Sequence, residues 1–285
     1  MPVRLVAIDI DGTLVDSRGR LPEANRDAIA AVVAAGVHVA LVTGRSYPFA
    51  RDVAGALPAS VTIIASNGAV ERTLDGVGVA QRLLSRERAQ AVLQHTQRFR
   101  STSALIFDRD THAHVVAESM DWSHPQRLSY WRARQHLIAR ATPLEAALTE
   151  DPVQVMFNGT VSEMRAVHAL VSGVEGVSIF QTEYEHRNFA LVDVMAQAAT
   201  KGVALAARAS ALGLTAAEVM AIGDNLNDLP MLDYAGLPVI MGNAVQGLRG
   251  RGFTETGSQD EAGVAAALRR HVLEAVADAG PSVVP

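Results

Sequence analysis

Two acidic residues stand close together near the start of the chain, where their side chains can act jointly. Asp9 and Asp11 flank Ile10 directly after an apolar run, and in an extended chain alternate residues point to the same side. Two carboxylates so close repel each other, and a divalent cation between them would remove that conflict. An acidic helix cap would explain one of these carboxylates but not the pair. The spacing therefore predicts a cation site.

A second acidic group follows another apolar run, far along the chain. Asp224 and Asp228 share a short segment with Asn225 and Asn227, which add neutral oxygen atoms. Hard oxygen donors without His or Cys suit magnesium rather than zinc. A turn rich in Asp and Asn is the ordinary alternative. We favour the metal interpretation because the first acidic pair is predicted at the same edge of the sheet.

Two further features can hold or neutralise an anion. Thr43 and Gly44 follow an apolar run at a predicted helix start, where a hydroxyl and free backbone N–H groups can hold a phosphate. Lys201 is the only lysine in the chain, beside 24 arginines. A compact ammonium differs from a planar guanidinium, so we expect Lys201 to neutralise charge between phosphate and carboxylate. Chance is the alternative for a lone lysine.

Apolar runs that alternate with helical patterns would position these residues. Strands that are buried on both faces and alternate with helices imply a parallel, doubly wound sheet. The loops at the carboxyl ends of such strands form the ligand crevice, and the polar residues above lie in those loops. The predicted core strands are 3–10, 37–42, 61–65, 219–222 and 237–241, and the predicted core helices are 22–35, 47–57, 201–212 and 260–276.

The pattern changes after the third core strand. A hairpin is predicted at 69–82 around Asp75 and Gly76, and mixed elements follow. The predicted helices there are 85–99, 124–141 and 161–171, and the predicted strands are 104–107, 113–117, 153–158, 177–181 and 189–194. The expected fold class is therefore α/β, with a doubly wound core at 1–84 and 190–285 and an inserted α+β domain at 85–189.

The predicted insert differs in charge from the rest of the chain. From Arg86 to Arg140 there are nine arginines and five acidic residues, and the insert holds both tryptophans, Trp122 and Trp131. A solvated arginine-rich face with packed aromatic residues is the ordinary interpretation. The functional interpretation is a lid that meets an anionic substrate.

Composition limits the classes of partner. The net charge of -5 over 285 residues gives no overall attraction to nucleic acid or to an anionic membrane. The lack of cysteine excludes disulfides, thiolate metal sites and cysteine nucleophiles, and it suits the cytoplasm. No stretch is long and apolar enough to span a bilayer. We expect a cytoplasmic protein that binds neither nucleic acid nor membrane.

Four segments, in this order, resemble the motifs of the haloacid dehalogenase superfamily. They are Asp9-Ile10-Asp11-Gly12-Thr13, Thr43-Gly44-Arg45, Lys201-Gly202 and Gly223-Asp224-Asn225-Leu226-Asn227-Asp228-Leu229-Pro230-Met231. Ser66-Asn67-Gly68-Ala69, Met241-Gly242-Asn243-Ala244 and Gly263-Val264 resemble its Cof-type phosphatase branch, subfamily IIB. The resemblance covers the whole chain, and the insert lies where that branch carries its α/β cap on a Rossmann-like core.

The resemblance implies a role for each matching residue. Asp9 would be the nucleophile and a magnesium ligand. Asp11 would give its backbone carbonyl to the metal and its carboxyl as general acid and then base. The remaining roles are charge neutralisation by Lys201, phosphoryl binding by Thr43, Gly44 and Asn227, and magnesium binding by Asp224 and Asp228.

The implied function is a magnesium-dependent phosphomonoester hydrolase that acts on small phosphorylated metabolites through an aspartyl-phosphate. A phosphomutase of the same superfamily is one alternative, and it would need a bisphosphate activator. A non-enzymatic phospho-acceptor is another, although signalling receivers are much shorter and have no cap. A catalytically inactive binding protein is disfavoured because every catalytic position is filled. Branch members often carry acids before the lysine, whereas 196–199 has none here, which leaves the substrate open.

Overall fold

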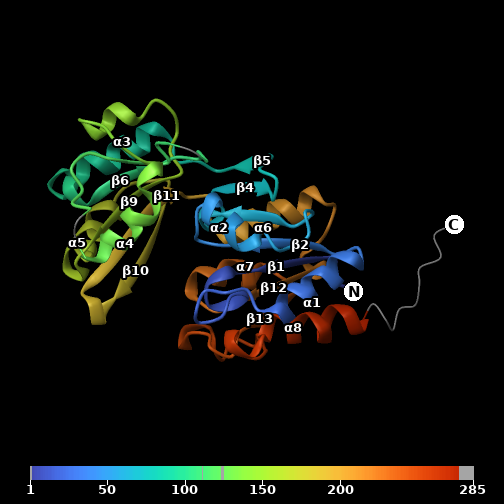
Figure 1. Ribbon diagram of the computed structural model, residues 1–285. Coiled ribbons are helices and arrows are strands. Elements are labelled where there is room, and N and C mark those ends of the chain that lie inside the picture. Colours follow the sequence, from blue (N-terminus) through green and yellow to red (C-terminus); the bar gives the residue numbers. More distant parts are fainter. Residues whose placement is uncertain (1, 111, 123–124, 276–285) are drawn as a thin grey trace. The chain divides into compact units, whose positions relative to one another are not determined.

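The computed structural model describes residues 2–110, 112–122 and 125–275 and divides into two compact units (Figure 1). The core unit comprises Met1–Gln81 and Thr200–Pro285, and the inserted unit comprises Arg82–Ala199. Within the described residues, no helix combines the length and apolar character needed to cross a membrane.

The described part of the core unit is built on an eight-stranded sheet. In sheet order its strands are β14 Thr254–Glu255, β13 Leu237–Ile240, β12 Val219–Gly223, β1 Leu5–Ile8, β2 His38–Val42, β3 Thr62–Ala65, β4 Val70–Thr73 and β5 Gly78–Gln81. The strands from β14 to β3 run parallel, and β4 and β5 form the predicted antiparallel hairpin. The predicted α/β class with a parallel sheet is confirmed.

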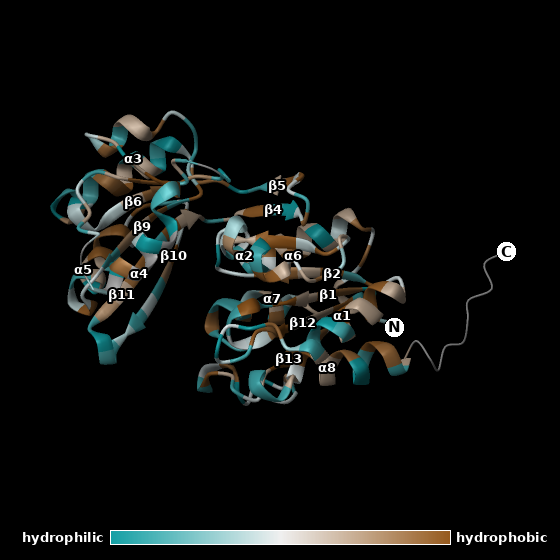
Figure 2. Cartoon of the chain, in the orientation of Figure 1, coloured by the Kyte–Doolittle hydropathy of each residue, from teal (hydrophilic) through white to brown (hydrophobic). Residues whose placement is uncertain are grey.

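Helices cover both faces of this sheet. They are α1 Glu23–Ala34, α2 Tyr47–Ala54, α6 Lys201–Ala211, α7 Leu229–Tyr234 and α8 Gly263–Leu268. Strand β1 is wholly buried, and its residues Leu5 and Ala7 join one cluster with Leu205 of α6 and Leu232 of α7. The alternate residues of β1 point to the opposite face, and α1 and α8 pack against each other. Figure 2 shows the apolar colouring concentrated on the core strands.

The inserted unit has a sheet and a core of its own. Its strands, in sheet order, are β10 Val177–Tyr184, β11 Phe189–Ala196, β9 Gln154–Gly159, β6 Ser103–Ile106, β7 Val115–Ala117 and β8 Ile138–Arg140. Its helices are α3 Arg86–His95, α4 Pro125–Arg134 and α5 Val161–Val171. Phe157 and Val192 lie in a buried cluster that draws only on this unit. Mixed helices and a largely antiparallel sheet agree with the predicted α+β insert.

The units divide at different residues from those predicted at 84/85 and 189/190. Leu84 packs into the core of the inserted unit, so the first division falls at Gln81. β11 pairs along its whole length with β10 and with β9 over 190–195, so the second division falls at Ala199.

Several predicted helices have different ends, and those predicted over 47–57 and 85–99 end at Ala54 and His95. The region 124–141 was predicted as helical, but Ile138–Arg140 is a strand because it pairs with β7. The closing helix was predicted to begin at 260, but Ala262 has a left-handed φ of 53° and α8 begins at Gly263. The predicted end of that helix at residue 276 and the tail beyond it lie outside the described residues.

Candidate active site

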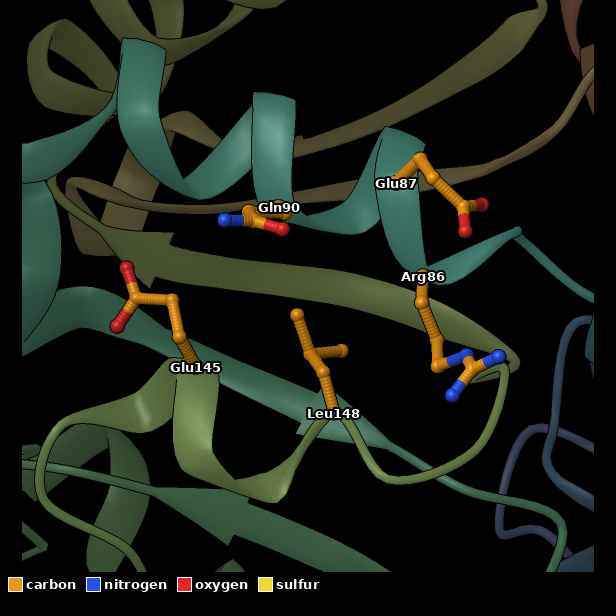
Figure 3. Close-up of a pocket in the computed structure, with 5 residues that line it drawn as sticks. All are labelled: Arg86, Glu87, Gln90, Glu145 and Leu148. Atoms are coloured by element: carbon orange, nitrogen blue, oxygen red, sulfur yellow. The ribbon is translucent and has the colours of Figure 1, made fainter.

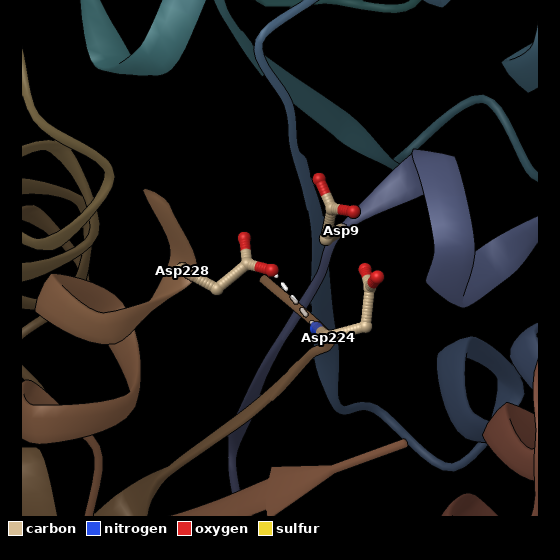
Figure 4. Close-up of side chains that lie close together, drawn as sticks. All are labelled: Asp9, Asp224 and Asp228. Carbon is tan, nitrogen blue, oxygen red and sulfur yellow. Dashed lines mark hydrogen bonds between the residues drawn. The ribbon is translucent and has the colours of Figure 1, made fainter. Parts of the chain in front are cut away.

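Adjacent strands bring together two segments that lie far apart in the sequence. β1 pairs with β12, with Ile8 opposite Ile222, and the Asp9 N–H donates to the Ile222 carbonyl over 3.0 Å. Asp9 follows β1 and Asp224 follows β12, so both lie at the carboxyl edge of the sheet. Figure 4 shows their carboxylates side by side.

Three carboxylates form a buried cluster at this edge. Asp9, Asp224 and Asp228 each offer an oxygen atom within 4.8 Å of the other two. Asp228 also organises its own loop, because its Oδ2 accepts the backbone N–H groups of Asp224 at 2.9 Å and Asn225 at 3.0 Å. Figure 4 marks the first of these bonds. The loop therefore fixes Asp224 through the side chain of Asp228.

Lys201 is the cation that meets this cluster. Its Nζ donates to Asp9 Oδ1 and to Asp228 Oδ1, each over 2.6 Å, and the side chain is completely buried. Burial alone would lower the pKa of Lys201, but the charges of Asp228 and Asp9 outweigh it and raise the pKa. Lys201 begins α6, whose N-cap Thr200 accepts the Val203 N–H. The ammonium therefore stays charged between the two carboxylates.

The carboxylates themselves resist ionisation. Burial, and then the charge of Asp228, raises the pKa of Asp9 well above its ordinary value despite Lys201. Burial and Asp228 likewise raise the pKa of Asp224 to about 6, although the Thr13 hydroxyl donates to Asp224 Oδ1 over 2.9 Å. Three acids thus share one ammonium, and negative charge is in excess.

This arrangement fits a hard divalent cation. Among the described residues, no donor reaches Asp9 Oδ2 or Asp224 Oδ2, whereas both oxygens of Asp228 accept hydrogen bonds. Oxygen donors with excess negative charge are the ligands that magnesium prefers. Gly12 keeps the approach open, because its φ is +84° and a Cβ there would collide with the Asp224 carboxylate. Asp9 and Asp224 are therefore the side chains best placed to hold the ion.

Asp11 lies apart from the cluster of three carboxylates. Its side chain is 59% exposed, and its two oxygens accept from Arg45 Nε at 2.8 Å and Nη2 at 2.6 Å. The strand alternation that predicted a shared crevice does not extend this far, because β1 ends at Ile8 and the chain turns over Ile10–Leu14. Asp11 therefore lies at the edge of the site in an ion pair with Arg45.

Residues predicted to hold phosphate come from three loops. Thr43 follows β2, and its Oγ1 accepts the Arg45 N–H over 3.1 Å. Gly44 lies against Asn67, since a Cβ on Gly44 would be 3.2 Å from Asn67 Oδ1. Asn227 Nδ2 donates to the same Oδ1 over 3.3 Å. The loops after β2, β3 and β12 thus converge.

Sequence reasoning gave no role to three residues that organise the site. Arg45 pairs with Asp11, and Asn67 joins the loops just described. Asn243 donates from Nδ2 to the Gly12 carbonyl over 2.7 Å and accepts the Gln259 N–H over 2.8 Å. Polar residues within a few positions of the end of a buried strand, a looser form of the signal used for Asp9, include Asn67 after β3 and Asn243 after β13.

Residues 6–268 match the family profile of the haloacid dehalogenase-like hydrolases. The chain belongs to this family. The predicted resemblance and the hydrolase class are confirmed.

Individual relatives match almost the whole chain. The stress response protein YhaX of Bacillus subtilis is 26% identical over 95% of this chain and 94% of its own length. The 5-amino-6-(5-phospho-D-ribitylamino)uracil phosphatase YcsE of the same organism is 26% identical over 95% of this chain and 96% of its own. A haloacid dehalogenase-like hydrolase from Bacteroides thetaiotaomicron superimposes with a TM-score of 0.80 at 23% identity, covering 94% and 99% of the two chains.

Proposed function

We propose that this hydrolase is a magnesium-dependent phosphatase that cleaves phosphomonoesters of small metabolites through an aspartyl-phosphate on Asp9. The observation that carries the proposal is the buried Asp9 carboxylate. Lys201 holds its Oδ1 at 2.6 Å, its Oδ2 has no donor among the described residues, and the carboxylate lies close to that of Asp224. The name of the relative YcsE, a phosphatase of a small phosphorylated metabolite, supports the same reaction class.

Asp9 attacks in the first step. One of its carboxylate oxygens forms a bond to phosphorus while the bond from phosphorus to the ester oxygen breaks. Asp11, in its protonated form, gives its proton to that oxygen, so the alcohol leaves neutral. Lys201 keeps Oδ1 fixed and offsets the charge that accumulates around Asp9.

Water completes the reaction in the second step. Asp11, now a carboxylate, takes a proton as the water oxygen bonds to phosphorus, and the bond between phosphorus and Asp9 breaks. Inorganic phosphate is released, and Asp9 returns to its starting state. Because Arg45 engages both oxygens of Asp11, it must release at least one of them for these proton transfers.

The proposed ligands of magnesium are the carboxylates of Asp9 and Asp224 and the backbone carbonyl of Asp11. When bound, the ion would neutralise charge on the nucleophile and on the phosphoryl oxygens. Asp228, predicted as a ligand, is proposed instead to orient the loop, because both its oxygens accept hydrogen bonds.

Thr43, Gly44 and Asn227 are proposed to hold the phosphoryl group, because their loops converge beside Asn67.

We also propose that the inserted unit is the cap domain of the family branch. The lack of cysteine supports a cytoplasmic location.

The proposal is tested by phosphate release from a panel of small phosphomonoesters. Metal-stripped protein should be inactive and should recover with magnesium, and Asp9→Asn should remain inactive because the amide cannot attack phosphorus. Full activity of purified Asp9→Asn, or of protein stripped of divalent metal, would overturn it. A phosphomutase would instead move phosphate between sugar positions without release, so mass balance separates this alternative.

A further inference from the structure

We propose that a cavity in the inserted unit binds a flat heteroaromatic ring that carries hydrogen-bond acceptors, such as a pyrimidine dione. This tryptophan cavity has a volume of about 280 Å³, and its lining includes Ala117, Glu118, Met120, Trp122, Trp131 and Arg140. Pockets for drug-sized ligands span roughly 300–1,000 Å³. The cavity therefore has room for one small ring system.

Two indoles supply an aromatic surface. Trp122 and Trp131 stack with their ring centroids 5.7 Å apart and their planes at 27°, and both side chains are half-buried. They are the only tryptophans in the chain. Aromatic side chains offer a flat face on which heterocyclic rings stack. The pair therefore offers a stacking surface for a planar ring.

The surface is held by neighbouring elements. Trp131 lies on α4, which is anchored to β9 because Arg127 Nη2 donates to the Asn158 carbonyl over 2.7 Å. Met120 is only 7% exposed, and its sulfur lies 3.6 Å from Asn158 Nδ2. The loop that carries Met120 and Trp122 and the helix that carries Trp131 thus converge on the same residue of the sheet. A ring would meet a preformed surface.

Arg140 presents hydrogen-bond donors at the cavity. Arg140 is exposed, and its Nε donates to the Glu118 carbonyl over 2.7 Å. Among the described residues, its two terminal nitrogens have no partner. The Oε2 atom of Glu118 is already engaged, since it accepts the Leu144 N–H at 3.1 Å and lies 3.5 Å from Arg100 Nε. Arg140 therefore favours rings whose edges carry carbonyl oxygens.

A second cavity in the same unit lacks these features. It measures about 340 Å³ and is lined by Arg86, Glu87, Gln90, Glu145 and Leu148 (Figure 3). Its lining combines charges of both signs and has no aromatic ring. Arg86 is exposed, as Arg140 is, so Arg86→Ala is a matched control for Arg140→Ala.

Tryptophan fluorescence provides the direct test, because the whole signal arises in the tryptophan cavity. Uridine should quench the tryptophan fluorescence saturably, while ribose, which lacks the uracil ring, should not. Trp122→Phe and Trp131→Phe each retain one reporter and an aromatic ring, and each should still respond. Arg140→Ala should weaken uridine binding about tenfold, as expected for loss of a contact to a stacked ring. Arg86→Ala should leave it unchanged.

Quenching by uridine that never saturates would overturn the proposal. Equal affinities of Arg140→Ala and Arg86→Ala for uridine would also overturn it. Circular dichroism of each variant separates loss of binding from loss of fold. This measurement needs no catalysis, so it stands even if the proposed phosphatase activity fails.

Kinetics identify the source of the ring, and this arm rests on the proposed function. Uridine 5′-phosphate carries a uracil ring that ribose 5-phosphate lacks. If the cavity binds the ring of the leaving group, Arg140→Ala should raise the KM for uridine 5′-phosphate about tenfold and leave the KM for ribose 5-phosphate unchanged. If uridine binding weakens while both KM values stay unchanged, the ring belongs to a separate effector. Either result supports ring binding in the tryptophan cavity. If no phosphomonoester were hydrolysed, only the phosphatase proposal would be contradicted.

Discussion

At the scale of single residues, Asp11 and Arg45 carry the step most open to experiment. The two side chains form a bidentate pair at 2.8 and 2.6 Å, and this geometry holds a carboxylate strongly in place. The proposed proton transfers need Asp11 to exchange this partner for the substrate oxygen. Arg45 therefore positions Asp11 at the edge of the site, but this ion pair must break during turnover.

Replacing Asp11 by Asn should slow hydrolysis according to the leaving group. The amide cannot donate the proton, and general acid help is worth roughly a hundred- to ten-thousand-fold. Alkyl phosphates should lose rate by about that factor, while p-nitrophenyl phosphate, which leaves without a proton, should lose far less in its first step. The kcat/KM values for the two esters, which report the first step alone, measure the difference. An unchanged rate on the alkyl ester would remove Asp11 from the mechanism.

The raised pKa of Asp224 predicts how the metal-free protein responds to pH. Its pKa rises from 3.8 to about 6 on folding, so between these values the folded state binds more protons than the unfolded state. The free energy of unfolding should therefore fall as pH rises through this window. Asp224→Asn has no such proton, so its unfolding midpoint should fall less over the same range. Denaturant titrations in chelator measure both, and parallel curves would contradict the prediction.

At the scale of elements, the sequence predicts buried strands better than it predicts loops and the ends of helices. Apolar runs such as 61–65 predict buried strands because the core of a parallel sheet accepts few other residues, and β3 lies there. The strand Ile138–Arg140 was not predicted, because it forms by pairing with β7, which lies some twenty residues earlier in the chain. The late start of α8 depends on the left-handed conformation of Ala262.

The same limit applies to the site. Asp9, Lys201 and Asp224 could be anticipated because they follow strands or begin a helix, and sheet order then brings them together. Asn67 and Asn243 act through hydrogen bonds between loops. Asn67 has a positive φ of 50°, and no sequence pattern specified its partners.

Asn243 is predicted to position the loop that carries Asp11. Its side chain links the Gly12 carbonyl to the Gln259 N–H. Asn243→Ala should therefore lower kcat, by up to about a hundredfold, because small shifts in geometry are costly for catalysis. Asn243→Asp keeps the acceptor for Gln259 but loses the donor to Gly12, and it should be similarly impaired in kcat. If Asn243→Asp were as active as the unchanged protein, the bond to Gly12 would have no such role.

At the scale of the whole molecule, each unit carries its own hydrophobic cluster. The cluster with Leu5, Leu205 and Leu232 lies in the core unit, and the cluster with Phe157 and Val192 lies in the inserted unit. The carboxylates and Lys201 belong entirely to the core unit. Metal binding should therefore not depend on packing inside the inserted unit.

Phe157→Ala tests this separation. Truncating a fully buried phenylalanine should destabilise the inserted unit by roughly 3–5 kcal/mol. Magnesium affinity under native conditions should stay unchanged, because none of the cation's proposed ligands lies in that unit. Denaturant unfolding and calorimetric titration of the same variant give the two values. A joint loss of stability and of metal affinity would show that the units are not independent in this respect.

The most direct measurement is calorimetric titration of metal-free protein with magnesium, comparing Asp224→Asn with Asp233→Asn. Asp233 lies exposed on α7, a few residues beyond the acidic loop, so both variants lose the same charge from neighbouring segments. We expect Asp233→Asn to bind one magnesium ion as tightly as the unchanged protein and Asp224→Asn to bind it at least tenfold more weakly. Equal affinity in the two variants would contradict a shared cation between Asp9 and Asp224.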